Sequence, residues 1–206
     1  MVIDKLHYIS QAAGNQSHLN SIEKVLKNGV KWIQLRVKEQ SEEKVLEIAQ
    51  EASSLCDEFG AKLIINDYPA IALSSGAYGV HLGLDDMPVM EARAILGANR
   101  CIGGTANTFD DVLRRVKEGV DYIGLGPYKF TETKKNLSPI LGLEGYHNIL
   151  DQLRSANITI PVIAIGGIEK SDIDPLLSTG IHGVAVSGLL TKNNNLNEEF
   201  YVNYCR

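Results

Sequence analysis

Short apolar runs alternate with helical segments along the whole chain, and this alternation limits the fold more than any other feature. Strands are predicted at 6–9, 32–35, 62–65, 79–82, 101–103, 122–125, 161–165 and 183–186. Helices are predicted between them at 21–27, 41–59, 69–74, 89–96, 109–117, 143–153 and 171–178. Most strands are apolar along nearly their whole length, which is typical of parallel strands covered by helices. Eight such units in 206 residues favour a compact (β/α)8 barrel, a TIM barrel, with a doubly wound open sheet as the alternative.

Local signals support individual helices. Ser41 precedes two glutamates and an apolar face, which predicts an N-cap, and Gly60 is suited to ending the same helix. The final segment, 198–206, is rich in aromatic residues and is predicted to be a last helix. It would pack either across the barrel or against another subunit, and the second arrangement would make a homo-oligomer.

Length and charge narrow the class of protein. The chain has no strong change in composition, so we expect one domain over 1–206. A net charge of -5 gives no overall basic field, and we therefore expect neither nucleic acid nor an anionic membrane as a partner. Cys56, Cys101 and Cys205 are widely spaced and follow no metal-binding pattern, which predicts reduced structural thiols. No leader pattern or run of transmembrane length occurs, so a cytoplasmic protein is expected.

In a barrel, the loops after the strands form one rim, and the polar residues can be compared with that rule. Gln34, Arg36 and Lys38 follow the second strand at a spacing of two, which in extended geometry directs them to one side. Three donors on one face are suited to an anion. The alternative is the alternating exposure of an ordinary amphipathic strand end.

Two aspartates, Asp67 and Asp86, follow the third and fourth predicted strands. Asn66 and Asp67 close the third strand, and Asp86 follows the fourth strand just after His81 and Gly83. Asp67 is suited to binding magnesium but equally to capping the next helix. Two carboxylates on adjacent strands can share one divalent cation. His81 has no second histidine at ligand spacing, so we expect it to be packed or hydrogen-bonded.

The loop after the sixth strand carries Thr131, Thr133 and Lys134, whose hydroxyl and ammonium groups can hold an anion. Its alternative role is a solvated turn. Thr105 adds a further hydroxyl after the fifth strand.

Small residues end the last two strands. Gly166 and Gly167 follow the seventh strand, and Ser187 and Gly188 follow the eighth. Loops at these positions of a barrel often bind phosphate through main-chain amides, although the glycines are equally able to serve only as turns.

With these residues in order, the chain resembles the thiamine phosphate synthase family from the first strand to the eighth. The shared motifs are Gln-x-Arg-x-Lys at Gln34, Arg36 and Lys38, Asn-Asp at Asn66 and Asp67, His-x-Gly-x-x-Asp at His81, Gly83 and Asp86, Gly-x-Gly-Pro followed by Thr-x-Thr-Lys at Gly124, Gly126, Pro127, Thr131, Thr133 and Lys134, and Gly-Gly at Gly166 and Gly167.

The resemblance implies a transferase that acts on small phosphorylated molecules. It would join hydroxymethylpyrimidine diphosphate to thiazole phosphate, with release of pyrophosphate. Asp67 and Asp86 would hold Mg2+ on the diphosphate, and Arg36, Lys38 and Lys134 would be the catalytic cations. The remaining implied contacts are Gln34 to the pyrimidine, Asn66 and Thr105 to the diphosphate, and Thr131, Thr133, Gly167, Ser187 and Gly188 to the thiazole phosphate.

Three positions depart from the family pattern. Leu84 replaces a usual glutamine, Asn107 replaces a common histidine, and Ser187-Gly188 replaces Ile-Ser. These changes affect substrate affinity more than reaction class. Two alternatives remain: a related thiazole tautomerase, which would need a proton carrier near Asn107, and a barrel that only binds phosphate without catalysis.

Overall fold

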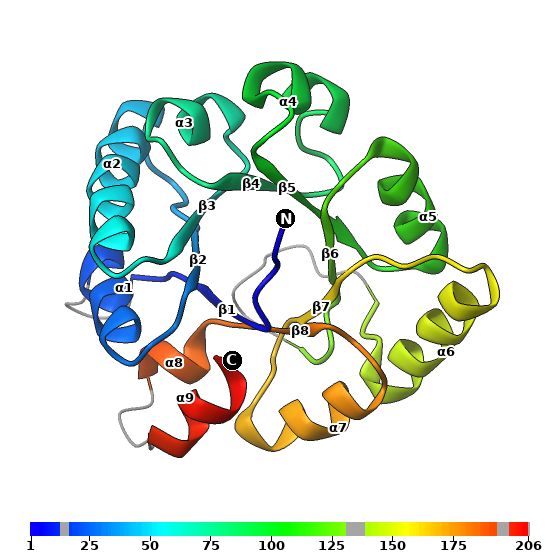
Figure 1. Cartoon of the computed structure of the whole chain (residues 1–206). Helices are drawn as coiled ribbons and strands as arrows, with labels where there is room; N and C mark the ends of the chain where they lie inside the picture. Colours follow the sequence, from blue (N-terminus) through cyan, green and yellow to red (C-terminus); the bar gives the residue numbers. More distant parts are fainter. Residues whose placement is uncertain (13–16, 131–138, 193–197, 206) are drawn as a thin grey trace.

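The protein is a closed barrel of eight parallel strands surrounded by helices (Figure 1). The computed structural model describes residues 1–12, 17–130, 139–192 and 198–205. Each strand pairs with the next in sequence, and β8 pairs with β1 through Tyr8 and Val186. The (β/α)8 prediction is confirmed and the open sheet is wrong. The strands are β1 (Leu6–Ile9), β2 (Trp32–Leu35), β3 (Lys62–Asn66), β4 (Gly79–Leu82), β5 (Cys101–Ala106), β6 (Tyr122–Leu125), β7 (Val162–Ile165) and β8 (Gly183–Val186).

The helices form a ring around the outside of the barrel (Figure 1). Ser41 Oγ accepts a hydrogen bond from the N–H of Lys44, and Gly60 has a φ of 58°, so both predicted ends of the second helix are confirmed. The helical elements are α1 (His18–Lys27), α2 (Glu42–Glu58), α3 (Pro69–Ser74), α4 (Val89–Leu96), α5 (Phe109–Glu118), α6 (Gly142–Ser155), the 3-10 turn η1 (Lys170–Asp172), α7 (Ile173–Ser178), α8 (Gly188–Lys192) and α9 (Glu198–Tyr204).

Four details differ from the prediction. Helix α1 begins at His18 rather than at residue 21, because Ser17 supplies the cap that accepts from the N–H of Asn20. Strand β5 extends to Ala106 instead of ending at Gly103. The region predicted as one helix at 171–178 begins with the 3-10 turn η1, and the short helix α8 was not predicted.

Apolar side chains form two layers. The larger layer lies between the strands and the helices, and the smaller one fills the barrel interior around Trp32, Ile64 and Tyr122. Ile3 belongs to the interior cluster, and the N-terminal segment lies over the near opening of the barrel in Figure 1. This end is therefore closed by the chain itself, which leaves the opposite end for a ligand.

The last helix packs on its own chain. Phe200 and Tyr201 of α9 are buried in the larger apolar layer, and Tyr204 Oη donates to the carboxylate of Asp174 on α7. Of the two arrangements predicted for this segment, the structure shows packing against the barrel. None of the helices in the described ranges is long and apolar enough to cross a lipid bilayer.

Candidate active site

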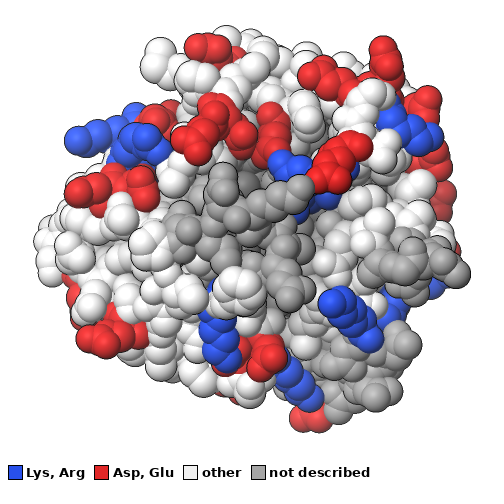
Figure 2. All heavy atoms as spheres, turned by 180° about the vertical axis from the view of Figure 1, so that it is seen from behind, with Lys and Arg blue, Asp and Glu red and all other residues white. Residues whose placement is uncertain are grey.

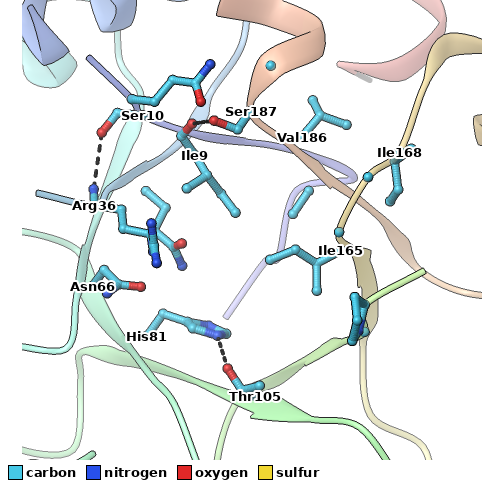
Figure 3. Close-up of a pocket in the computed structure, with 18 of the residues that line it drawn as sticks. Ile9, Ser10, Arg36, Asn66, His81, Thr105, Ile165, Ile168, Val186 and Ser187 are labelled. Carbon is cyan, nitrogen blue, oxygen red and sulfur yellow. Dashed lines mark hydrogen bonds between the residues drawn. The ribbon is translucent and has the colours of Figure 1, made fainter. Parts of the chain in front are cut away.

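A cavity of about 660 Å³ opens where the strands end, and residues at or just after the ends of all eight strands line it. In Figure 3, Arg36, Asn66 and His81 lie along one side of it, whereas Ile165 and Ile168 lie on the other. The predicted site residues that line the cavity are Gln34, Arg36, Lys38, Asn66, Asp67, Asp86, Thr105, Gly167, Ser187 and Gly188. Thr131, Thr133 and Lys134 lie outside the described residues.

The charge around this end of the molecule is mixed. Figure 2 shows the face opposite to that of Figure 1, on which acidic and basic side chains are interspersed without a broad basic surface. Attraction of an anion must therefore come from the individual cations that line the cavity.

Arg36 and Lys38 line the cavity from the loop after β2. The N–H of Arg36 donates to Ser10 Oγ at 3.1 Å (Figure 3), which ties this loop to the end of β1. Burial lowers the pKa of the Arg36 guanidinium, while the nearby Asp67 carboxylate acts in the opposite direction. Lys38 Nζ forms an ion pair with Asp67 Oδ2. Gln34, inside the barrel, is 6% exposed. Gln34, Arg36 and Lys38 therefore all line the same cavity, as the spacing predicted.

Asp67 leaves the end of β3 in an unusual backbone conformation. Its φ is 71°, a region that aspartate tolerates better than most residues, and its N–H donates to His81 O at 2.9 Å. The N-cap of α3 is Tyr68, with no side-chain cap hydrogen bond. The capping role that the sequence left open for Asp67 is therefore not observed.

Asp86 lies close enough to Asp67 for the two carboxyl groups to interact. Its Oδ2 accepts from the N–H of Gly83 at 2.6 Å. Burial raises the pKa of Asp86, and the adjacent Asp67 carboxyl raises it further; the Gly83 N–H and Lys38 oppose this shift. Two acidic groups thus share one pocket in which negative charge is costly.

This pair fits a magnesium ion that is also bound by a substrate. Across the described ranges, no group of three or more His, Cys, Asp and Glu side chains could hold a metal by itself. Mg2+ is commonly held by one or two carboxylates together with substrate phosphates and water. The oxygen donors of Asp67 and Asp86, with the pKa of Asp86 raised, match this kind of site.

His81 connects the cavity with the barrel interior. Its Nδ1 lies 3.0 Å from Tyr122 Oη, and its Nε2 lies 3.0 Å from Thr105 Oγ1 (Figure 3). A Cβ on Gly103 would lie 2.5 Å from His81 Nδ1, so only glycine leaves room for this arrangement. The expectation of a hydrogen-bonded histidine is confirmed, and the contact holds the Thr105 hydroxyl at the cavity wall.

The glycines after β7 have a packing role. Gly166 and Gly167 have φ values of 98° and 67°, and a Cβ on Gly167 would lie 2.6 Å from Phe130 O. Gly166 O accepts from the N–H of Lys129 at 2.9 Å. The pair therefore allows close approach of the segment that leads into residues 131–138, in addition to lining the cavity.

At the end of β8, Ser187 Oγ donates to Ile9 O at 2.7 Å (Figure 3). This hydroxyl joins β8 to β1 across the seam of the barrel. Gly188 follows it with free space around its Cα, since a Cβ at this position would meet nothing nearer than Gln11 Nε2 at 4.0 Å.

The part of the site that follows β1 was missed in the sequence. Ser10 and Gln11 line the cavity after β1, where the rule applied to the other strand ends would have found them. Asn107 is buried, and its Nδ2 donates to Gly126 O and Pro139 O, on both sides of the segment that carries Thr131. Asn107 therefore connects Gly126 with Pro139. It occupies the position where a tautomerase would need a proton carrier.

Comparison with known proteins identifies the family to which the chain belongs. The family model described as thiamine monophosphate synthase matches residues 6–190. A thiamine-phosphate synthase of Flavobacterium johnsoniae is 49% identical over 97% of this chain and 98% of its own. Another from Bacteroides fragilis is 50% identical over 90% of this chain and 91% of its own.

Among solved structures, thiamine phosphate pyrophosphorylase from Pyrococcus furiosus superposes with a TM-score of 0.83 and 30% identity, covering 98% of this chain and 95% of that one. Sequence and fold agree over nearly the whole length. The chain belongs to the thiamine monophosphate synthase family.

Proposed function

We propose that the protein is a thiamine-phosphate synthase, which joins hydroxymethylpyrimidine diphosphate to thiazole phosphate and releases pyrophosphate. The observation that carries this proposal is the convergence of Arg36, Lys38, Asp67 and Asp86 on one wall of a cavity whose other wall is largely apolar, in a chain of this family. The charged wall suits a diphosphate, and the apolar wall suits an aromatic ring.

The chemistry requires stabilisation of a leaving anion. The bond between the pyrimidine methylene carbon and the diphosphate oxygen breaks, and its electron pair leaves with pyrophosphate. The thiazole nitrogen then gives its lone pair to the methylene carbon. Arg36 and Lys38 would neutralise charge that develops on the leaving oxygens, which stabilises the transition state more than the ground state. Lys134 would add a third cation.

Asp67 and Asp86 would hold Mg2+, which when bound supplies positive charge to the diphosphate. Gln34 would orient the pyrimidine, and Asn66 and Thr105 would contact the diphosphate, with Thr105 held by His81. The thiazole phosphate would lie toward Gly167, Ser187 and Gly188, and the hydroxyl groups of Thr131 and Thr133 would bind it as well. The thiazole nitrogen already carries its lone pair, so the reaction needs no covalent nucleophile.

The three free cysteines bear on the compartment in which the protein works. Cys56 and Cys101 are buried free thiols and Cys205 is partly buried, a state suited to a reducing compartment, and we place the enzyme in the cytoplasm. Its partners would be small phosphorylated substrates. A homo-oligomer remains a prediction, which light scattering of the purified protein would check.

The test is product formation by the purified protein. With both substrates and Mg2+, we expect thiamine phosphate and pyrophosphate in equal amounts, and neither product when one substrate is left out. Chelation of Mg2+ should abolish turnover, and its return should restore it. Absence of thiamine phosphate with both substrates and Mg2+ would end the proposal. Isomerisation of the thiazole without consumption of the diphosphate would instead identify a tautomerase.

A further inference from the structure

Gln11, which lines the cavity, has a buried side-chain nitrogen, Nε2, without a hydrogen-bond partner among the described residues. The only comparable side-chain atom in those ranges is Trp32 Nε1, which lies in the apolar interior of the barrel. A buried donor without an acceptor is strongly unfavourable, so a donor retained at a cavity wall points to a ligand that completes it.

The position of Gln11 identifies which part of the cavity this ligand would occupy. Gln11 follows β1, directly after the residues that are tied to Ser187 and to the Arg36 loop. Its Nε2 lies near Gly188, at 4.0 Å from the place where a Cβ on that glycine would lie. Lys192, on the same short helix as Gly188, lines the cavity as well.

This corner combines a neutral donor, a cation and a glycine that leaves the main chain open. No carboxylate of the Asp67 and Asp86 pair belongs to it, since those groups follow β3 and β4 across the barrel. A phosphate monoester is suited to such a corner, because an amide N–H donates to an anionic oxygen without adding charge.

We propose that Gln11 is a substrate-binding residue whose Nε2 donates a hydrogen bond to a phosphate oxygen of the thiazole phosphate. The identity of this ligand rests on the proposed function. The hydrogen bond forms only when the substrate is bound, so Gln11 contributes to affinity for one substrate and not to folding.

The experiment compares Gln11→Leu and Gln11→Glu with Gln50→Leu, a change at an exposed glutamine of α2. Leucine removes the donor, and glutamate adds a negative charge beside the phosphate. For Gln11→Leu we expect the KM for thiazole phosphate to rise about tenfold or more, with a larger rise for Gln11→Glu. The KM for the pyrimidine diphosphate should stay within about twofold of that of the unchanged protein.

A second measurement separates binding from structure. Because leucine removes an unsatisfied buried donor, the melting temperature of Gln11→Leu without ligand should equal or exceed that of the unchanged protein. The stabilisation that thiazole phosphate gives should be smaller in this variant. Unchanged KM for thiazole phosphate in both Gln11 variants, or a rise confined to the pyrimidine substrate, would overturn the inference. A fall in melting temperature without a change in KM would also overturn it.

Calorimetry with thiazole phosphate, in the presence of Mg2+ and pyrophosphate, keeps this inference separate from the proposed function. If the unchanged protein binds thiazole phosphate and Gln11→Leu binds it at least about tenfold more weakly, while no thiamine phosphate is ever formed, the inference stands and the synthase proposal fails. If thiamine phosphate is formed and binding is the same in both, the synthase proposal stands and the inference fails.

Discussion

Asp67 has a backbone conformation that few residues adopt, and this conformation directs its carboxylate toward Lys38 and Asp86. The left-handed φ of 71° turns the chain out of β3, and the N–H of Asp67 is fixed to His81 O. A residue with a bulkier or branched side chain would be strained here. The carboxylate thus lies at the meeting point of a cation and a second acid, which is a position for chemistry rather than for helix capping.

Replacement of Asp67 by asparagine should therefore reduce turnover far more than stability. Asparagine keeps the shape and tolerates the same backbone conformation, but it removes the charge available to Mg2+. The ion pair with Lys38 is partly exposed, so its loss should cost only about 1 kcal/mol or less of unfolding free energy. We expect the rate to fall about 100-fold or more, as measured by steady-state kinetics beside urea denaturation.

The matched control is Asp4→Asn, which breaks a partly exposed ion pair with Lys62 at the start of β3, away from the strand ends that line the cavity. It should lose a similar, small amount of stability and keep full turnover. Comparable losses of stability and rate in Asp67→Asn would instead mark Asp67 as a structural residue.

The thiols illustrate how burial controls the reactivity of a residue. Burial raises the pKa of Cys56 to about 12 and that of Cys205 to about 11, and it also raises the pKa of Cys101. Since the thiolate is the reactive form, all three should be almost entirely protonated and slow to react at pH 8. We expect alkylation of the native protein to be at least about 100-fold slower than that of the urea-unfolded protein, as followed by mass spectrometry.

The order of reaction is a further check on this prediction. Cys205 is the least buried of the three thiols and should be modified first. Rapid modification of Cys56 or Cys101 in the native protein at pH 8 would show that the surrounding core opens readily.

At the scale of elements, periodicity predicted the strands and longer helices well because each buries a continuous apolar face. Periodicity did not predict the end of β5, where the buried residues are small. Gly103 and Gly104 have low strand propensity, so β5 was predicted to end early. They are required because the Tyr122 ring and the Arg115 side chain occupy the space beside them, which depends on residues distant in sequence. Helix α8 is too short to give a periodic signal.

The candidate site was predictable to the extent that it follows strand ends. Gln34, Arg36, Asp67 and Asp86 were found by that rule and by motif, whereas Gln11 was missed because the rule was not applied to the first strand. No sequence pattern indicates that its Nε2 is buried without a partner. Such a fact depends on how the loop after β1 packs against β8, and only coordinates show it.

Helix α5 joins two strand ends through one buried arginine. Arg115 Nη2 donates to Gly83 O at 2.5 Å, and its Nε donates to Thr105 O at 3.1 Å. The N–H of Gly83 in turn holds Asp86. In the sequence Arg115 resembles any charged residue near a helix end, yet its side chain is only 4% exposed. It positions the strand ends that carry Asp86 and Thr105.

Arg115→Met should therefore destabilise the protein and also disturb the site. Loss of charge-assisted hydrogen bonds to two carbonyl groups should lower the unfolding free energy by about 2–3 kcal/mol. The KM for the pyrimidine diphosphate should rise, because Gly83, whose N–H holds Asp86, loses the hydrogen bond from Arg115 to its carbonyl oxygen. Urea denaturation and steady-state kinetics give the two values.

Arg114, the residue before Arg115, provides the control for this prediction. Arg114 is 49% exposed and lies 3.9 Å from Asp111 and Glu118, so Arg114→Met should change stability by less than about 0.5 kcal/mol and leave kinetics unaltered. Equal effects of the two substitutions would show that Arg115 does not link β4 and β5.

At the scale of the whole molecule, closure of the barrel brings distant residues to one rim. The seam between β8 and β1 completes the ring, and it sets Gln11 beside Gly188 and Ser187 beside Ile9. In the proposed reaction, the thiazole phosphate needs residues from both sides of this seam, Gln11 after β1 and Gly188 after β8. Catalysis should therefore depend on features that only close the ring and contribute no chemistry.

Gly183 is such a feature. It begins β8, and the next residue, Val184, donates its N–H to Lys5 O at 2.8 Å. A Cβ on Gly183 would lie 2.0 Å from Lys5 O and 2.7 Å from Lys5 C, both main-chain atoms that cannot move aside cheaply. Even alanine would push the start of β1 away from β8 and break hydrogen bonds of the seam.

We expect Gly183→Ala to lower the unfolding free energy by about 3 kcal/mol or more, because the clash involves main chain at the closing pair of strands. Gly188→Ala is the comparison, since its Cβ would meet nothing nearer than 4.0 Å, and its cost should stay below about 1 kcal/mol. Urea denaturation measures both. If Gly183→Ala is as stable as Gly188→Ala, β1 and β8 can part without cost, and closure of the ring is not what holds the two halves of the site together.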